Sequence, residues 1–380
     1  MTRTPASAVD LAKAMLGSPR FSAALTTASI GAAVCSFSIR QTIGWAGLFG
    51  ILGLLVALAI ASLIAQWEEI GWRALLPISL LVFTGWAALS ILWSWYQWAT
   101  LGGLAYLAVF TVLAVYIALV RDTIQIVRAF GDVLRFVLVV SIALEIFSGL
   151  LIDAPIRFLG IQAHLAEGGP IQGLLGTRNQ LGIVALIAAV TFGTELRTRS
   201  IRPDLAIGSL VLAAATMAFT RSPLIGGVIV VLGGAIVALY ALRRVKPSRR
   251  TVAQLALLAA VAVAALVAWA SRARIIELTN AGGELDFRLT LWQRMLTLID
   301  LNPVEGWGWL GYWRAEISPF QAFGVSERVP VSGLNAYLDV WFQLGFVGVV
   351  IFVGLAGLAD RKSTRLNSSH SAVSRMPSSA

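Results

Sequence analysis

The sequence predicts an all-α fold: a polytopic bundle of about ten transmembrane helices. Of the 380 residues, 58% are hydrophobic and only 13% are charged, and the mean hydropathy is +0.82. Soluble domains are about half apolar and about a quarter charged, so this composition indicates a membrane protein. The apolar residues also occur in runs of the roughly 20 residues that a helix needs to cross a hydrocarbon core.

Ten apolar runs are long enough to be spanning helices. They lie at residues 21–39, 44–66, 74–96, 101–120, 133–152, 180–196, 205–220, 224–242, 252–271 and 335–358. The first run is longer than the apolar core of a typical signal peptide, and further runs follow it, so we expect it to be a retained span. Residues 1–360 are therefore expected to form one transmembrane domain.

The positive charges predict how this domain lies in the membrane. The net charge is +10, but the charges fall in short blocks between apolar runs, which argues against a nucleic-acid-binding surface. The largest block lies at 243–250, whereas the short connecting segments on the other side carry only Arg40, Arg157, Arg178 and Arg221. By the positive-inside rule, we expect an inner (cytoplasmic) membrane protein with both chain ends, including the N-terminus, in the cytoplasm.

Two of the predicted outer segments are longer than simple connections. The first, 153–177, is rich in glycine, and the second, 272–334, is a large extracytoplasmic loop. Within the second, residues 288–300 place Leu291, Trp292, Met295 and Ile299 on one helical face. This pattern is typical of an amphipathic helix that lies on the membrane or on the bundle.

The last segment, 361–380, changes abruptly to a serine-rich sequence without periodicity. Its composition predicts a disordered tail. It also resembles translated sequencing-adapter read-through, so we expect an artefactual tail and a natural sequence interrupted near Asp360. No functional argument rests on this segment.

Few residues could support metal or cofactor chemistry. Cys35 is the single cysteine, the histidines are His164 and His370, and no Asp-x-Asp motif occurs. We therefore predict neither a metal site nor a cofactor. Glu145 lies inside the fifth run and is a functional candidate. Alternatively, it pairs with Arg135 or Arg157, or faces a hydrated cavity.

Polar motifs gather where runs six, eight and ten begin on the predicted outer side. These starts read GTRN at 176–179, TRSP at 220–223 and SGLN at 332–335. Helix N-termini present unpaired N–H groups and a positive dipole end, and the guanidinium fork of arginine suits phosphate oxygens. Arg178, Asn179, Arg221 and Asn335 are thus candidates for binding a diphosphate. The alternative is ordinary helix caps, with interfacial arginines that contact the phosphates of membrane lipids.

Possible general bases lie in the second outer loop, at Glu305, Glu316 and Glu327, unless these are solvated loop charges. The loop also contains the turn-forming sequence PVEGWG at 303–308.

Taken together, these motifs resemble the O-antigen ligase and O-antigen polymerase superfamily of bacterial envelopes. The resemblance rests on GTRNQLG at 176–182, TRSP at 220–223, Arg288 with Trp292, PVEGWG at 303–308, and LNAYLD at 334–339 followed by LGFVG at 344–348. It implies metal-independent, inverting glycosyl transfer on the outer leaflet. The donor would be a glycan on undecaprenyl diphosphate, the acceptor a glycan or glycolipid, and Arg221 and Arg288 would hold the diphosphate.

One departure from the family concerns the catalytic base. The family commonly has a histidine before the asparagine of its closing motif, where this chain has Leu334. Leucine cannot accept a proton, so Glu305 or Glu327 would take that role, unless the chain has diverged from ligase chemistry or the sequence contains an error. A rival class is a lipid-linked glycan transporter or a non-catalytic scaffold. Transporters often have repeated halves and midplane polar residues, of which this sequence shows little.

Overall fold

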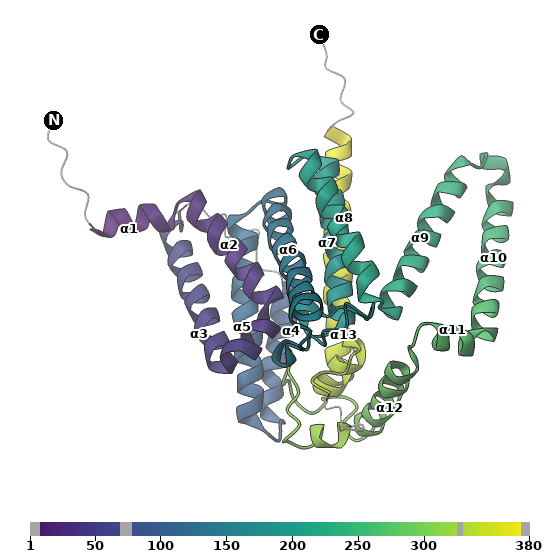
Figure 1. The fold of residues 1–380 in the computed structure, drawn as a ribbon. Helices are drawn as coiled ribbons and strands as arrows, with labels where there is room; N and C mark the ends of the chain where they lie inside the picture. Colours follow the sequence, from purple (N-terminus) through teal and green to yellow (C-terminus); the bar gives the residue numbers. More distant parts are fainter. Residues whose placement is uncertain (1–7, 69–77, 325–329, 374–380) are drawn as a thin grey trace, which may run out of the picture. The chain divides into compact units, whose positions relative to one another are not determined.

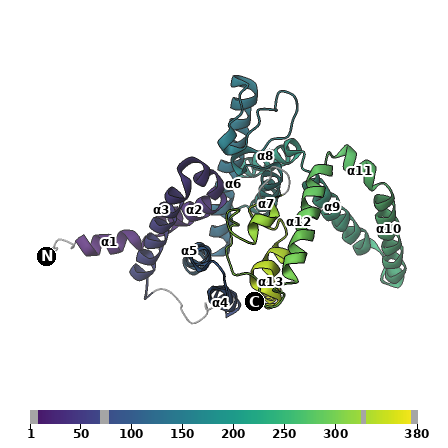
Figure 2. The ribbon, with the colours of Figure 1, turned by 90° about the horizontal axis from the view of Figure 1, so that it is seen from below.

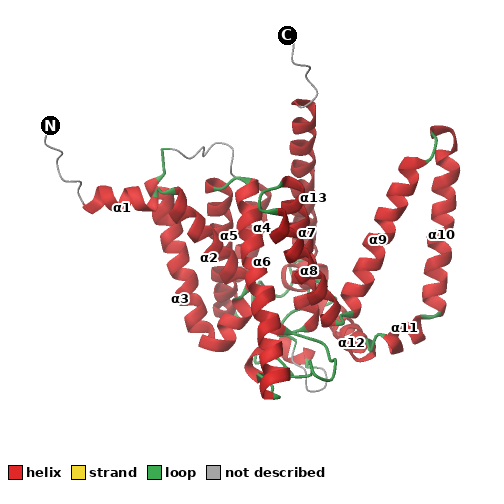
Figure 3. Cartoon of the chain, turned by 45° about the horizontal axis from the view of Figure 1, so that its top comes forward, coloured by secondary structure: helices red, strands yellow, loops and turns green. Residues whose placement is uncertain are grey.

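The predicted all-α fold is confirmed. The computed structural model describes residues 8–68, 78–324 and 330–373, and across these ranges it contains helices and loops but no β-strand (Figure 3). The chain divides into two compact units. The first comprises Met1–Ile70 with Leu113–Gly282, and the second comprises Gly71–Val112 with Gly283–Ala380.

The first unit has its core among α2, α6, α7 and α8. Its helices are α1 (Ala8–Leu16), α2 (Pro19–Val34), α3 (Ser36–Ala65), α6 (Thr123–Ile146), α7 (Arg178–Thr198), α8 (Pro203–Thr220), α9 (Pro223–Arg244), α10 (Arg250–Ala270) and α11 (Arg272–Leu278). Leu138, Leu181 and Phe192 are fully buried in this core. Helices α9 and α10 form a hairpin that extends away from it (Figure 1), and the apolar side chains of α10 are exposed.

The second unit packs around aromatic side chains. It contains α4 (Ile78–Leu89), the start of α5 (Gln97–Val120), α12 (Gly282–Ile299) and α13 (Ala336–Val373), and α4 lies beside α13 (Figure 2). Leu291, Met295 and Ile299 are buried on one face of α12, against an aromatic cluster that includes Trp313 and Phe342. The predicted amphipathic helix is therefore confirmed, and its apolar face packs on the protein.

Eight helices in the described ranges are long and apolar enough to cross a membrane. They are α3, α5, α6 with its π-helical extension to Ile152, α7, α8, α9, α10 and the Ala336–Leu358 part of α13. The predicted first run, 21–39, is divided, because α2 ends at Val34 and α3 begins at Ser36. The third run gives the shorter apolar helix Ile78–Leu92, and residues 74–77 lie outside the described ranges.

Helix α13 continues beyond its apolar part to Val373. The extent of the transmembrane domain and the artefactual origin of residues 361–380 stay predictions.

Candidate functional site

The N-terminal ends of α7 and α9 meet in the first unit. Thr177 caps α7 by accepting a hydrogen bond from the Gln180 amide at 3.3 Å, and Ser222 caps α9 by accepting one from the Ile225 amide at 3.3 Å. The Ser222 hydroxyl also donates to Oδ1 of Asn179 at 2.6 Å. Two of the three predicted helix N-termini are thus brought together, so their unpaired N–H groups and positive dipole ends lie side by side.

Arg221 lies at this junction, with its guanidinium available to a ligand. The residue ends α8 in a left-handed conformation (φ 45°) and is exposed. Among the described residues, its side chain has no hydrogen-bond or ion-pair partner. Its Nη2 atom is 3.3 Å from where a Cβ on Gly168 would stand, so residue 168 of the glycine-rich loop at 153–177 lies directly against the guanidinium.

That loop is fixed to α6 by Glu145, which is 2% exposed. The Glu145 carboxylate accepts hydrogen bonds from the amides of Gln172 at 2.6 Å and Gly173 at 2.8 Å. Of the alternatives considered from the sequence, pairing with Arg135 or Arg157 is not seen, and backbone N–H groups of the loop bond to this carboxylate instead. Glu145 therefore positions the segment that leads to the start of α7.

Two further hydrogen bonds fix the same loop. The Ser141 hydroxyl accepts from the Leu174 amide at 3.1 Å, and the Ile171 amide donates to the Phe219 carbonyl of α8 at 3.2 Å. Because residues 171–174, which follow Gly168 and Gly169, are bonded to α6 and α8, the fold positions this glycine pair beside Arg221.

The third predicted helix N-terminus, that of α13, lies in the second unit. Asn335 caps this helix, its Oδ1 accepting from the amides of Tyr337 at 3.1 Å and Leu338 at 3.4 Å. The indole N–H of Trp292 donates to the Gly333 carbonyl at 2.9 Å, which fixes α12 against the turn before α13. Leu334 is 43% exposed in that turn.

Arg288 lies one helical turn before Trp292 on the same face of α12. Its side chain is partly exposed and forms no hydrogen bond or ion pair within the described part of the chain. Arg288 thus lies on the face of α12 that contacts the turn before α13 through Trp292. Because Arg221 and Arg288 belong to different units, their convergence on one diphosphate stays a prediction.

The PVEGWG motif inserts against an interruption in α13. Gly345 has φ 67° and ψ −174°, which breaks the helix and leaves backbone groups without helical partners. The amides of Trp307 and Gly308 donate to the carbonyls of Phe342 at 3.0 Å and Gln343 at 2.8 Å. In return, the Phe346 amide donates to the Pro303 carbonyl at 2.9 Å. The motif therefore supplies hydrogen-bond partners to backbone groups of α13 on both sides of the interruption.

The two predicted bases differ in what the structure describes of them. Glu305 is exposed beside this interruption, and its carbonyl accepts a hydrogen bond from the Trp93 indole at 3.0 Å. Its carboxylate makes no ion pair with a described side chain. Glu327 lies outside the described residues.

Comparison with known protein families shows which family these residues match. Residues 206–353 match the family model described as O-antigen ligase. The chain carries an O-antigen ligase domain. The match contains Arg221, Arg288, the PVEGWG motif and the N-terminus of α13, and it confirms the resemblance predicted from the sequence. No curated protein and no solved structure matches the chain.

The match to the O-antigen ligase family supports glycan transfer in general, and the long apolar helices support a multi-pass membrane protein. The domain begins after α7, so GTRNQLG at 176–182 lies before the matched residues. Asn179 joins that motif to the domain through its hydrogen bond with Ser222.

A buried polar network inside the O-antigen ligase domain was not found from the sequence. Oδ1 of Asp339 accepts from Gln343 Nε2 at 2.7 Å and from the Trp313 indole at 2.9 Å. Oε1 of Gln343 accepts from the amides of Leu310 and Gly311, both at 2.8 Å. This network fixes the segment after PVEGWG to α13. Its only sequence signal was a carboxylate and an amide four residues apart on one helix face.

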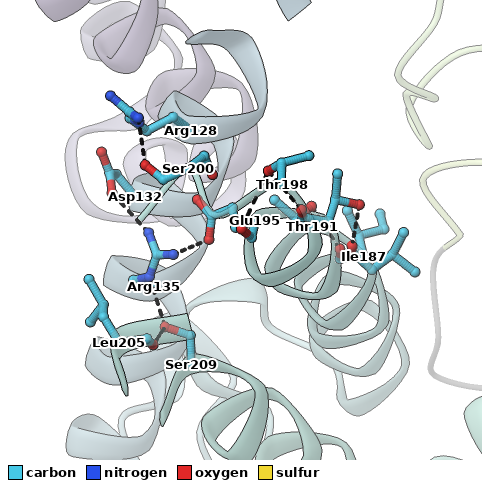
Figure 4. Close-up of polar contacts among 12 residues, drawn as sticks. Arg128, Asp132, Arg135, Ile187, Thr191, Glu195, Thr198, Ser200, Leu205 and Ser209 are labelled. Carbon is cyan, nitrogen blue, oxygen red and sulfur yellow. Dashed lines mark hydrogen bonds and ion pairs between the residues drawn. The ribbon is translucent and has the colours of Figure 1, made fainter. Parts of the chain in front are cut away.

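A second network missed from the sequence joins α6, α7 and α8 (Figure 4). The Arg135 guanidinium forms ion pairs with Asp132 at 2.9 Å and with Glu195, and donates to the Ser209 hydroxyl at 2.8 Å. Glu195 is fully buried, and Arg128 donates to the Ser200 carbonyl at 2.6 Å. Ion pairing between distant helices cannot be deduced from one sequence, since many pairings are compatible with it.

A metal centre finds no support in the described ranges, where no three His, Cys, Asp or Glu side chains are grouped to hold an ion. The arrangement offers instead helix N-termini and unpaired guanidinium groups, both of which favour a phosphate-bearing ligand.

Proposed function

We propose that this chain transfers a glycan from undecaprenyl diphosphate to a glycan or glycolipid acceptor on the outer face of the cytoplasmic membrane. The O-antigen ligase domain supports the class of reaction. The observation that carries the diphosphate donor is Arg221, an arginine without a described partner at the joined N-termini of α7 and α9. The arginine and the two helix N-termini both favour a doubly charged phosphate group.

In the proposed reaction, an acceptor hydroxyl attacks the anomeric carbon of the donor sugar and inverts its configuration. The bond between this carbon and the diphosphate oxygen breaks, and the electron pair leaves with the diphosphate. Arg221, with Arg178 and Asn179 at the start of α7, neutralises the negative charge that develops there, and Arg288 is proposed from the family resemblance to bind the same diphosphate. Cationic groups in place before the reaction stabilise the transition state without a metal ion.

The proton of the acceptor hydroxyl must pass to a base, and Leu334 cannot accept it. Glu305, exposed beside the α13 interruption, is the proposed base, with Glu327 as the other candidate. Asn335 uses its amide oxygen to cap α13, which leaves its amide N–H groups to donate to substrate oxygens.

The test is transfer by the purified full chain, with lipid-diphosphate glycan as donor and a glycolipid acceptor, in the presence of a metal chelator. Arg221→Ala and Arg288→Ala should each lower the transfer rate by about 100-fold or more, as expected for loss of a group that stabilises transition-state charge. Arg197→Ala, an exposed arginine at the other end of α7, is the matched control and should leave the rate unchanged.

Near-normal transfer by both the Arg221 and Arg288 variants would overturn the proposal. Movement of the lipid-linked glycan across the membrane without a new glycosidic bond would identify a transporter instead.

A further inference from the structure

We infer that a turn at residues 164–169 forms the subsite for the sugar bonded directly to the donor diphosphate, with Glu167 and His164 binding its hydroxyl groups. This inference rests on the proposed function and extends it to recognition of the sugar.

The turn folds tightly on itself beside Arg221. The Gly168 amide donates to the Leu165 carbonyl at 3.0 Å, and the Gly169 amide donates to the His164 carbonyl at 2.7 Å. Gly168 has φ +69°, a conformation that glycine adopts without strain, and its Cα faces the Arg221 guanidinium. A side chain at residue 168 would stand between the turn and the arginine.

Within this turn, the two polar side chains are those of Glu167 and His164. Both are exposed, and neither makes a hydrogen bond or ion pair with any side chain or backbone group in the described ranges. Glu167 immediately precedes Gly168, and Cβ of His164 is 2.5 Å from where a Cβ on Gly169 would stand. Both side chains therefore start from the backbone segment that contacts Arg221, and both are available to a ligand.

The turn is held in place from the residues that follow it. Ile171 is bonded to α8, and Gln172 and Gly173 are bonded to the buried Glu145 of α6. Because these bonds begin two residues after Gly169, the turn is positioned by two helices.

The charge of Glu167 decides which part of the donor it can bind. A carboxylate repels a diphosphate, whereas it accepts hydrogen bonds from neutral hydroxyl groups. In a lipid-diphosphate donor, the first sugar is bonded to the phosphate that Arg221 would hold, so its hydroxyls are the neutral groups nearest to the turn. His164 adds a ring that can both donate and accept a hydrogen bond.

The test compares two kinds of lipid on the full-length protein in detergent. One probe is undecaprenyl diphosphate, and the others are undecaprenyl diphosphates that each carry one glucose, galactose or N-acetylglucosamine. The variants are compared on the sugar-bearing lipid that binds most tightly to the unmodified chain. Glu167→Ala and His164→Ala should each weaken binding of this lipid by about tenfold, because each loses a charge-assisted or neutral hydrogen bond to the sugar. Their affinity for the sugar-free lipid should change less than about twofold.

Three variants complete the design. Arg221→Ala should weaken binding of both kinds of lipid, because it removes the phosphate contact that they share. Glu167→Gln, which keeps one acceptor oxygen, should lose less affinity than Glu167→Ala. Gln162→Ala, an exposed position in the same loop, should change neither affinity.

The inference is overturned if no sugar increases affinity over the sugar-free lipid, or if the Glu167 and His164 variants weaken both lipids equally or not at all. Failure of the proposed function gives a different result, since the unmodified chain would then either bind no lipid diphosphate or bind it without forming a glycosidic bond in the transfer assay.

Discussion

At Gly345 and Gly306, the backbone packing itself excludes a side chain. A Cβ on Gly345 would overlap the Val304 carbonyl, and one on Gly306 would stand 2.5 Å from the Gly345 amide nitrogen. Both residues also have positive φ, 67° and 70°. The two glycines therefore permit the close contact between PVEGWG and the interrupted α13.

Gly345→Ala should destabilise the protein strongly, by about 2 kcal/mol or more, because it combines backbone overlap with a strained conformation. Gly354→Ala in the same helix is the matched control, since nothing lies within 4 Å of a Cβ placed there. Thermal unfolding in detergent measures the difference. Equal unfolding temperatures for the two variants would contradict this account of the interruption.

The sequence indicated single candidate residues more readily than the groups that they contact. Arg221 and Asn335 stood out because helix starts favour capping residues, and arginine there indicates an anion. The role of Glu145 was not predictable, because its hydrogen-bond donors are backbone amides 27 and 28 residues away. Every residue type except proline can supply such donors, so no sequence motif marks them.

At the scale of elements, the Arg135 network fixes three helices of the first unit to one another. Arg135 on α6 contacts Glu195 on α7 and Ser209 on α8 (Figure 4). Its guanidinium also lies 4.8 Å from the centre of the Phe192 ring. The Glu195 carboxylate lies directly against Gly131 of α6. This network holds together the helices whose opposite ends, at Asn179 and Arg221, form the candidate anion site.

Arg135→Ala should destabilise the fold by about 3–5 kcal/mol, because it leaves the buried Glu195 charge without its partner. Asp132→Asn removes the other carboxylate paired with Arg135, but that side chain is 60% exposed, so its loss should change stability by less than about 1 kcal/mol. Unfolding in a denaturing detergent measures both effects.

The double variant Arg135→Met with Glu195→Met should recover much of the stability that Arg135→Ala loses, because neither buried charge is then left alone. An Arg135→Ala variant as stable as Asp132→Asn would rule out this role for the network.

Helix periodicity predicted α12 well, because a stripe of its apolar residues packs against the rest of the protein. The face of Leu291, Met295 and Ile299 is buried as expected, although α12 begins at Gly282, before the predicted start. Hydropathy did not locate the break at Cys35, because both sides of that position are apolar. An interruption inside an apolar run leaves the run's average hydropathy unchanged.

At the scale of the whole molecule, the charge distribution predicts which ends of the helices face the cytoplasm. The basic block at 243–250 follows α9, and the loop at 153–177 precedes α7. Because consecutive spans alternate in direction, the basic block and this loop should lie on opposite sides of the membrane. The candidate anion site would then face outward.

Thiol labelling tests this orientation in a Cys35→Ser background. A membrane-impermeant reagent should label Glu167→Cys in intact cells, but should label Lys246→Cys only after the membrane is permeabilised. Both residues are exposed in the structure, so burial does not bias the comparison. The reverse labelling pattern would invert the orientation and remove the outer-face site.

The sequence by itself predicted the all-α fold with its long apolar helices and the resemblance to O-antigen ligases, and it indicated arginines as candidates for binding a phosphate, since each follows from composition, apolar run length or short local motifs. Only the tertiary structure decided that α7 and α9 start side by side, that Glu145 fixes the loop next to Arg221, and that PVEGWG satisfies a broken helix. Those features are contacts between residues far apart in the chain. Many such pairings are compatible with one sequence, and the packing and hydrogen bonding of the folded chain select among them.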